Sequence, residues 1–191
     1  MQFAELTAAQ VTQVYQERMT ADFPPDELKP LSRIRRALSA GRYRCTGLFE
    51  GGELLAYGFF VILRRQDDTE LLLDYFAVDA AKRGQGIGSA FLRMLPEQFP
   101  EAGAVLIESE SPETAENHAE RILRERRIRF YLENGCLASG METSVFGVRY
   151  RVMELPLRKT HTPEQLRQIY AGLYRQILPP EMFREKIHFC K

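Results

Sequence analysis

The spacing of hydrophobic and polar positions changes along the chain. Some segments carry apolar residues three or four positions apart, as an amphipathic helix does, and others are short apolar runs bounded by turn residues, as strands are. The pattern predicts, in chain order, a strand at 2–6, a helix after Thr7, a helix at about 26–38, strands at 43–49, 54–63 and 71–78, a helix at 86–99, a strand at 104–107, a helix at 113–133, two strands within 142–155, a helix at 163–177 and a short helix after 180.

The segment 71–78 is almost continuously apolar and is broken only by Asp74, which is typical of a central strand covered on both faces. It leads into the run Arg-Gly-Gln-Gly-Ile-Gly-Ser at 83–89 and then into a helix. A strand, a tight glycine turn and a helix start direct several backbone N–H groups at one point, and the glycines permit positive φ. This geometry suits a phosphate group, and Arg83 adds a positive charge. The spacing alone leaves open a glycine turn that binds nothing.

Two other phosphate-binding motifs can be compared with this loop. A Walker loop requires Gly-Lys-Ser or Gly-Lys-Thr after four intervening residues, and the sequence contains no such run. The dinucleotide fingerprint G-x-G-x-x-G requires its third glycine one residue later than Gly88. Glu108 lies about 20 residues further on, where that fold has its ribose-binding acid. A nicotinamide dinucleotide therefore stays open as an alternative ligand.

The composition narrows the class of partner. Lys plus Arg and Asp plus Glu both number 26, so the formal net charge is zero. The sequence therefore lacks the excess of positive charge that favours binding to nucleic acid or to an anionic membrane. There is no apolar run long enough to span a membrane and no signal-peptide pattern at residues 1–6. Three cysteines without Cys-x-x-Cys spacing and three scattered histidines favour neither a disulfide framework nor a metal site. We expect a soluble cytoplasmic protein with a small-molecule partner and no metal.

Two sequence motifs together resemble the GNAT family of N-acetyltransferases. The first is Asp-Tyr-Phe-Ala-Val at 74–78 followed by the glycine loop, and the second is Arg-Phe-Tyr-Leu-Glu-Asn-Gly-Cys at 129–136. They occur in the family's order, about 45 residues apart, although Cys136 stands where the family usually has an aromatic residue. The resemblance implies an α/β fold in which a mixed sheet, flanked by helices, splays between strands 71–78 and 104–108. We expect a GNAT-like domain at 1–156 and a C-terminal helical extension at 157–191 packed on the same domain.

The resemblance also implies the activity and the cosubstrate. Acetyl-CoA would donate its acetyl group directly to an amine, so neither an enzyme nucleophile nor a metal is required. The main chain of the strand end would hold the pantetheine arm, and the amides of the loop would hold the pyrophosphate. The cofactor-binding residues implied in this way are Phe76, Ala77, Val78, Arg83, Gly84, Gln85, Gly86, Ile87, Gly88 and Ser89, together with Asn117 and Tyr131.

The transfer needs a group that accepts the amine's proton and a group that protonates the CoA thiolate. The resemblance makes Tyr131 the candidate acid. Asp74 and Glu108 are both candidate bases, and Glu110 is a weaker one. Alternation in the strand puts Asp74 on one face with Phe76. Asp74 could equally be a buried carboxylate paired with an arginine, and the sequence does not decide between these interpretations.

The helix at 113–133 carries a stripe of residues seven positions apart, Asn117, Arg124 and Tyr131, which we expect to face the cofactor. A second face would pack on the sheet, and on this face Arg126 would need a carboxylate partner. Arg121 and Arg124 could reach cofactor phosphates, but arginines beside several glutamates are more typical of a salt-bridged exposed surface. The apolar positions that define the second face are Ala115, Ala119, Ile122, Leu123 and Phe130.

A second function also fits the sequence. The chain could be a non-catalytic module that binds acyl-CoA as a sensor, with the Tyr-rich and Leu-rich tail from Thr160 onward contacting a partner. The sequence carries no signature of the acceptor, and the oligomeric state is equally open.

Overall fold

The structure is a computed structural model that describes residues 1–25, 27–66 and 68–190. The chain divides into two compact units, and each is built from two separate segments. The first unit comprises residues 1–62 and 74–98, and the second comprises residues 63–73 and 99–191. The change of unit at residue 74 falls inside one strand, so this strand contributes its first half to the second unit and its second half to the first.

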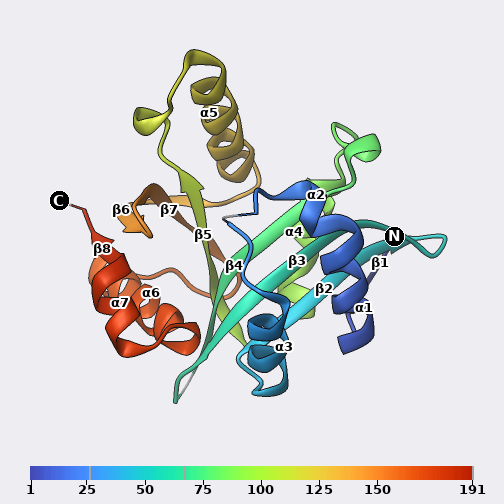
Figure 1. Cartoon of the computed structure of the whole chain (residues 1–191), viewed down its shortest axis with the longest axis horizontal. Helices are drawn as coiled ribbons and strands as arrows, with labels where there is room; N and C mark the ends of the chain where they lie inside the picture. Colours follow the sequence, from blue (N-terminus) through green and yellow to red (C-terminus); the bar gives the residue numbers. More distant parts are fainter. Residues whose placement is uncertain (26, 67, 191) are drawn as a thin grey trace. The chain divides into compact units, whose positions relative to one another are not determined.

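The first unit contains strands in the order β1, β2, β3, β4 (Figure 1). β1 pairs antiparallel with β2, and β2 with β3, through a Glu50–Glu53 turn. α1 packs against α3, α3 against β2, and α4 against β1. The bounds are β1 Gln2–Glu5, α1 Ala8–Val14, a π-helical segment Tyr15–Met19, α2 Thr20–Asp22, α3 Leu31–Ser39, β2 Tyr43–Glu50, β3 Glu53–Arg64, β4 Thr69–Val78 and α4 Ile87–Gln98.

Aromatic rings form the core of the first unit. Phe91 of α4 lies 4.9 Å from both Phe3 and Phe76, measured between ring centroids. Gly58 of β3 leaves room for this ring, because a Cβ there would lie 2.5 Å from Phe91. Phe59, the next residue of β3, points to the other face of the strand and makes ring contacts with aromatic residues of β2, β3 and β4, namely Tyr43, Tyr57 and Tyr75.

The second unit contains the start of β4 followed by β5, β7, β6 and β8 in spatial order. β4 and β5 are parallel, and the remaining pairs are antiparallel. The parallel ladder ends at the pair Leu73–Ile107, although β4 continues to Val78 and β5 to Glu110. The bounds are β5 Ala102–Glu110, a 3₁₀ turn Pro112–Thr114, α5 His118–Glu133, β6 Leu137–Val145, β7 Val148–Pro156, α6 Pro163–Ile177, α7 Pro180–Lys186 and β8 Ile187–Phe189.

α6 begins at a capping box and packs through one apolar face. The Thr162 side chain accepts from the backbone of Gln165, and the Gln165 side chain accepts from the backbone of Thr162. α6 contacts β6, and α7 contacts β8; Figure 1 draws β6 in orange and α7 and β8 in red. The buried residues of α6 recur at helical spacing and comprise Leu166, Ile169, Tyr170, Ala171, Leu173 and Tyr174.

A buried ionic cluster ties the segment before α6 to the sheet of the second unit. The imidazole of His161 lies between two carboxylates, with Nδ1 2.7 Å from Glu154 and Nε2 3.1 Å from Glu70. Glu70 of β4 also accepts a hydrogen bond of 3.0 Å from the backbone of Ala104 and lies 3.8 Å from Lys159. Burial raises the pKa of Glu70, and its interactions with His161, the backbone of Ala104 and Lys159 oppose this rise.

The structure changes several predicted boundaries. The second helix begins at Leu31, after Pro30, instead of near position 26, which lies outside the described residues. β5 runs from Ala102 to Glu110 and is longer than the strand predicted at 104–107. The three-residue strand β8 was not predicted. The hairpin and α6 match the predicted ranges closely. No helix among the described residues is both long and apolar enough to cross a bilayer.

Candidate functional site

The glycine loop of the first unit has the backbone that the sequence predicts for an anion site. Gly84 and Gly86 have φ values of 76° and 77°. A Cβ added at either residue would meet nothing within 4 Å, so the backbone conformation, and not crowding, requires glycine there. Gly88 differs from the prediction, because it is buried inside α4 and does not have positive φ.

The amides that follow the loop are available to a ligand. The backbone N–H of Ala90 donates to Gly86 at 2.9 Å and makes the first bond of α4. The N–H groups of Ile87, Gly88 and Ser89 precede this bond, and the positive end of the helix dipole lies at the same place. The start of α4 therefore offers three donors to an anion.

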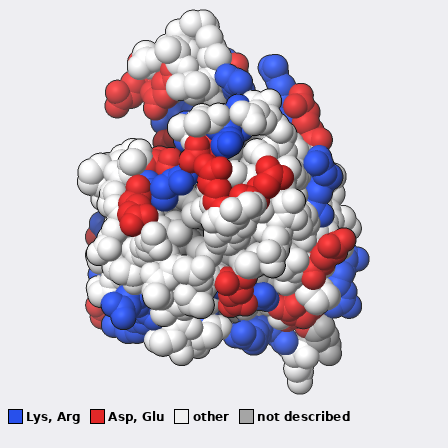
Figure 2. Space-filling view, turned by 90° about the vertical axis from the view of Figure 1, so that its right-hand side faces the viewer, with Lys and Arg blue, Asp and Glu red and all other residues white. Residues whose placement is uncertain are grey.

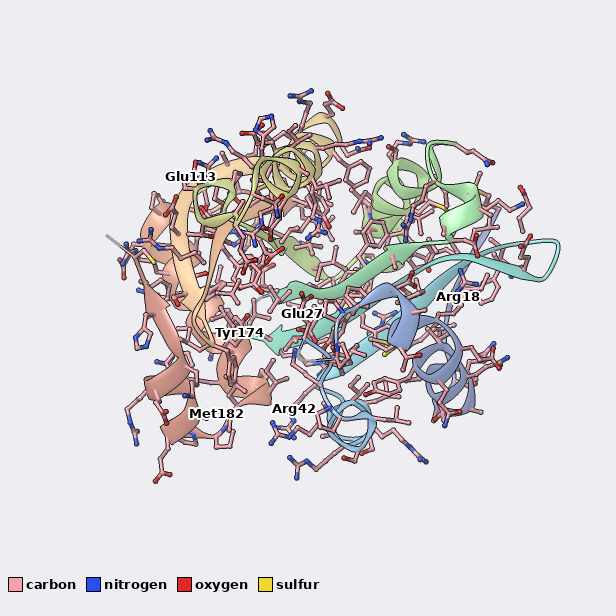
Figure 3. All side chains as sticks on the ribbon, turned by 45° about the horizontal axis from the view of Figure 1, so that its top comes forward. Arg18, Glu27, Arg42, Glu113, Tyr174 and Met182 are labelled. Atoms are coloured by element: carbon pink, nitrogen blue, oxygen red, sulfur yellow. The ribbon has the colours of Figure 1, made fainter. Side chains whose placement is uncertain are left out.

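Ion pairs and hydrogen bonds stabilise the segment 79–83, which connects β4 to this loop. Arg18, labelled in Figure 3, donates to Asp79 at 2.5 Å, and the Asp79 side chain accepts from the backbone of Ala81. The exposed side chain of Arg83 donates to the carbonyl of Val78 at 3.2 Å and lies 3.4 Å from Asp22. Arg83 is thus fixed at the loop with its charge exposed.

Asp74 lies in the first unit as a buried carboxylate with two partners. Its Oδ1 accepts from Lys29 Nζ at 2.7 Å, its Oδ2 accepts from the Tyr43 hydroxyl, and its side chain is 6% exposed. The partner is a lysine and not the arginine that the sequence suggested. Phe76, two residues further along β4, packs on Phe91.

Glu108 lies in the second unit and is held by two phenols of α6. The Tyr174 hydroxyl lies 2.8 Å and 3.0 Å from the two carboxylate oxygens of Glu108, and the Tyr170 hydroxyl donates to the same group. Thr143 of β6 lies 2.9 Å from the Tyr170 hydroxyl. Burial, and then the charge of Glu108, raise the pKa of Tyr170, so this phenol stays protonated. Figure 3 labels Tyr174 on α6.

Tyr131 is buried near the end of α5. Burial raises its pKa to about 12, and the charge of Arg127 opposes the rise. Among the residues that the structure describes, no group hydrogen-bonds to its hydroxyl. Because its pKa is raised, the phenol keeps its proton at neutral pH, and its O–H group can donate to a ligand.

α5 buries the opposite face from the one expected. Its buried residues are Arg124 and Tyr131, whereas Ile122 and Leu123 are 49% and 60% exposed. Asn117 is the N-cap, and its side chain accepts from the backbone of Glu120 at 2.9 Å. The helix therefore begins at His118 and not near 113.

Arg124 can be buried because its guanidinium is satisfied inside the second unit. It donates to the carbonyl of Ser111, the hydroxyl of Thr114 and the carboxylates of Glu110 and Glu120, at 2.7–3.0 Å. The prediction of salt bridges was right, but the prediction of an exposed Arg124 was wrong. Arg126 is exposed and needs no buried partner.

The predicted residues thus fall into two groups. The loop, the end of β4 and Asp74 belong to the first unit, and Glu108, Asn117 and Tyr131 belong to the second. Sequence reasoning did not identify the residues that bind the two candidate bases. These are Lys29 and Tyr43 at Asp74, and Tyr170 and Tyr174 at Glu108. Of these, only the two tyrosines of α6 left a signal, because a spacing of four places them on one helical face.

The described residues contain no group of three or more His, Cys, Asp and Glu side chains that could hold a metal ion. Figure 2 shows acidic and basic side chains intermixed on the face that it presents.

Comparison with known proteins identifies the class of protein. The family model described as the acetyltransferase (GNAT) family matches residues 9–135. The chain therefore belongs to the GNAT acetyltransferase family. The protein is an acyltransferase enzyme, and its family transfers acetyl groups from acyl-CoA. A sequence comparison with curated proteins finds no match.

Solved structures support the fold. The chain is similar to a putative GNAT-family acetyltransferase from Bacteroides thetaiotaomicron, with 19% identity, 89% of this chain and 93% of that chain covered, and a TM-score of 0.67. It is also similar to the ribosomal-protein-S18-alanine N-acetyltransferase from Escherichia coli, with 18% identity, coverage of 84% and 96%, and a TM-score of 0.55. An aminoglycoside 6′-N-acetyltransferase complexed with coenzyme A matches with 14% identity, coverage of 84% and 99%, and a TM-score of 0.60.

Proposed function

We propose that this enzyme transfers the acetyl group of acetyl-CoA directly to a primary amine. The observation that carries the proposal is the glycine loop. Gly84 and Gly86 have positive φ, the space beside them is open, and the first amides of α4 follow at once. An anion site of this kind suits the pyrophosphate of acetyl-CoA. Family membership favours this cosubstrate over a nicotinamide dinucleotide, and favours an enzyme over a sensor.

In this proposal the backbone groups of Phe76, Ala77 and Val78 hold the pantetheine arm. The amides of residues 83–89 hold the pyrophosphate, and Arg83 adds its charge. Asn117 has the weakest support of the proposed cofactor-binding residues, because its side-chain oxygen is engaged in capping α5. Only its amide N–H₂ group is left to donate to CoA.

The chemistry needs a base for the ammonium and an acid for the departing thiolate. Asp74 and Glu108 are the proposed bases, and Tyr131 is the proposed acid. The contacts favour Asp74 of the two carboxylates. Asp74 already binds the ammonium of Lys29, which is the same chemical group as an amine acceptor, whereas Glu108 is bound by two phenols.

Titration calorimetry with acetyl-CoA tests the loop. Gly86→Ala puts a Cβ on a residue at φ 77°, and Gly52→Ala does the same at φ 85° in the β2–β3 turn, with open space at both positions. Both variants carry a similar strain of about 1–3 kcal/mol. We expect about tenfold weaker acetyl-CoA binding, or more, for Gly86→Ala alone.

Two results would contradict the proposal. One is the absence of acetyl-CoA binding to the wild type at millimolar concentration. The other is equal loss of affinity in both glycine variants, which would mean that the loop affects binding only through stability. A screen of free amino acids, polyamines, aminoglycosides and peptide N-termini, with detection of released CoA, then identifies the acceptor.

A further inference from the structure

Lys29 places a primary amine directly against the proposed base. Its Nζ lies 2.7 Å from Asp74 Oδ1 and 5.1 Å from the centroid of the Tyr75 ring. The Asp74 side chain is 6% exposed, whereas that of Lys29 is 30% exposed, so the lysine side chain is more accessible to solvent than the carboxylate that it binds. Tyr43 donates to the other carboxylate oxygen and fixes the orientation of Asp74.

The backbone of Lys29 is held on both sides. Its N–H donates to the Tyr75 hydroxyl at 2.9 Å, and its carbonyl accepts from the Tyr15 hydroxyl at 3.1 Å. Tyr75 in turn donates to the carbonyl of Glu27 at 2.9 Å, and Pro30 restricts the backbone of Lys29, the residue before it. These four constraints are unnecessary for a solvated surface lysine. The side chain is therefore directed at Asp74 by the fold of the first unit.

The residue type matters as well. Only five of the 26 Lys and Arg residues are lysines. An arginine would form a stronger, bidentate pair with a buried carboxylate, but it stays charged and is no nucleophile. A lysine that gives its proton to a neighbouring carboxylate gains a free electron pair and becomes an acyl acceptor.

The acyl donor would lie close to this amine. The inference rests on the proposed function, in which the pantetheine arm follows the backbone of Phe76 to Val78. Asp74 precedes Phe76 by two residues on the same strand, a distance of about 7 Å at the rise of a β-strand. Asp74, Lys29, the strand end and the glycine loop all belong to the first unit.

We propose that Lys29 is a self-acetylation site of this enzyme. The ammonium of Lys29 gives a proton to the carboxylate of Asp74, and the free pair on Nζ attacks the carbonyl carbon of the acetyl thioester. The new N–C bond forms and the C–S bond breaks. The electron pair leaves on the CoA sulfur, which takes up a proton. The sum is lysine ammonium plus acetyl-CoA giving acetyl-lysine, CoA thiol and one proton.

The test uses the full chain and acetyl-CoA without an added amine. Samples taken over time are digested with chymotrypsin, because trypsin cuts poorly at a Lys-Pro bond, and acetylation at each lysine is measured by mass spectrometry. Lys186 is the internal control, since it forms a 2.7 Å ion pair with Glu185 and its side chain is 40% exposed. We expect Lys29 to be acetylated at least about tenfold faster than Lys186, at a rate independent of protein concentration. Asp74→Asn should reduce the rate at Lys29 to that at Lys186.

The outcomes separate this inference from the proposed function. Acetylation of Lys29 at the rate of Lys186 would mean uncatalysed chemistry and would overturn self-acetylation. A rate that rises with protein concentration would mean transfer between molecules and would also overturn it. Saturable acetyl-CoA binding, with CoA released to added amines while Lys29 stays unmodified, would leave the proposed function intact and reject Lys29. Absence of acetyl-CoA binding would reject both.

Discussion

At the scale of single residues, Tyr131 combines a raised pKa with a hydroxyl that makes no hydrogen bond to the described residues. Burial holds the phenol in its neutral form, with a pKa of about 12, so it can donate a proton at every pH at which an amine is acetylated. We predict that Tyr131→Phe lowers kcat by about 100-fold or more, as expected for loss of a general acid. Acetyl-CoA affinity should stay nearly unchanged, because the ring and its packing are kept.

A titration of tyrosinate absorbance checks the physical basis of this prediction. From about pH 9 to about pH 11, the wild type and Tyr131→Phe should form the same amount of tyrosinate, because an ordinary tyrosine titrates near 10 and Tyr131 does so about two units higher. An additional tyrosinate in the wild type near pH 10 would contradict the role, as would unchanged kcat in the variant.

The two carboxylates can be separated by their pH–rate profiles. We predict that Asp74→Asn removes the rising limb of kcat/KM and lowers the rate by about 100-fold or more, because its carboxylate accepts the proton of the amine. Glu108→Gln should keep the rising limb, because the amide can still accept a hydrogen bond from Tyr174. The reverse pattern would make Glu108 the base.

The sequence predicted some of these residues and could not predict others. The positive φ of Gly84 and Gly86 could be predicted because it is a local feature, whereas the role of Tyr131 stays a prediction from a sequence motif. The partners of Asp74 could not, because Lys29 and Tyr43 reach it through tertiary contacts over 45 and 31 residues. The same reason applies to Glu108, whose phenols lie 62 and 66 residues away.

At the scale of elements, periodicity predicted which segments are helices but not which face of α5 is buried. Apolar positions such as Leu123 indicated one face, and the structure buries Arg124 instead. A buried guanidinium is tolerated when its donors are satisfied, and four acceptors from the β5 end, the adjoining turn and α5 itself provide this. Nothing in the spacing of residues along α5 reveals those acceptors.

The contact between β4 and the segment after β7 makes stability depend on pH through Glu70. Burial raises the pKa of Glu70 above its ordinary value of 4.5. The folded state therefore holds this proton more firmly than the unfolded state does. The stability gained from neutral Glu70 is complete below pH 4.5 and is lost as the pH rises through the folded-state pKa.

Urea unfolding of the wild type and Glu70→Gln measures this effect, because glutamine keeps the shape of the neutral acid. We predict that the free energy of unfolding of the wild type, relative to that of Glu70→Gln, falls as the pH is raised from about 4 to about 8. A difference that is constant or rises with pH would mean that His161 and Lys159 outweigh the cost of burying Glu70.

At the scale of the whole molecule, the segment beyond residue 156 is integral to the second unit. The family model ends at residue 135, yet α6 buries several large apolar side chains and supplies both phenols that hold Glu108. Burial of one leucine or isoleucine contributes about 1.5–3 kcal/mol, so loss of α6 removes a large share of the stability of one domain. We therefore propose that the segment beyond residue 156 is not a separable module, because it belongs to the same compact unit as β5 to β7.

Two truncations test this view. We predict that residues 1–156 alone lose cooperative thermal unfolding, because removal of α6 exposes the side chains that it covers on β6. A chain ending at Leu178 keeps Tyr170 and Tyr174 and loses only α7 and the three-residue strand β8. It should unfold cooperatively, at a melting temperature lower than that of the full chain but with acetyl-CoA binding retained. If the 1–156 fragment melts cooperatively at the temperature of the full chain, the C-terminal segment is an independent appendage and its contacts with Glu108 are incidental to folding.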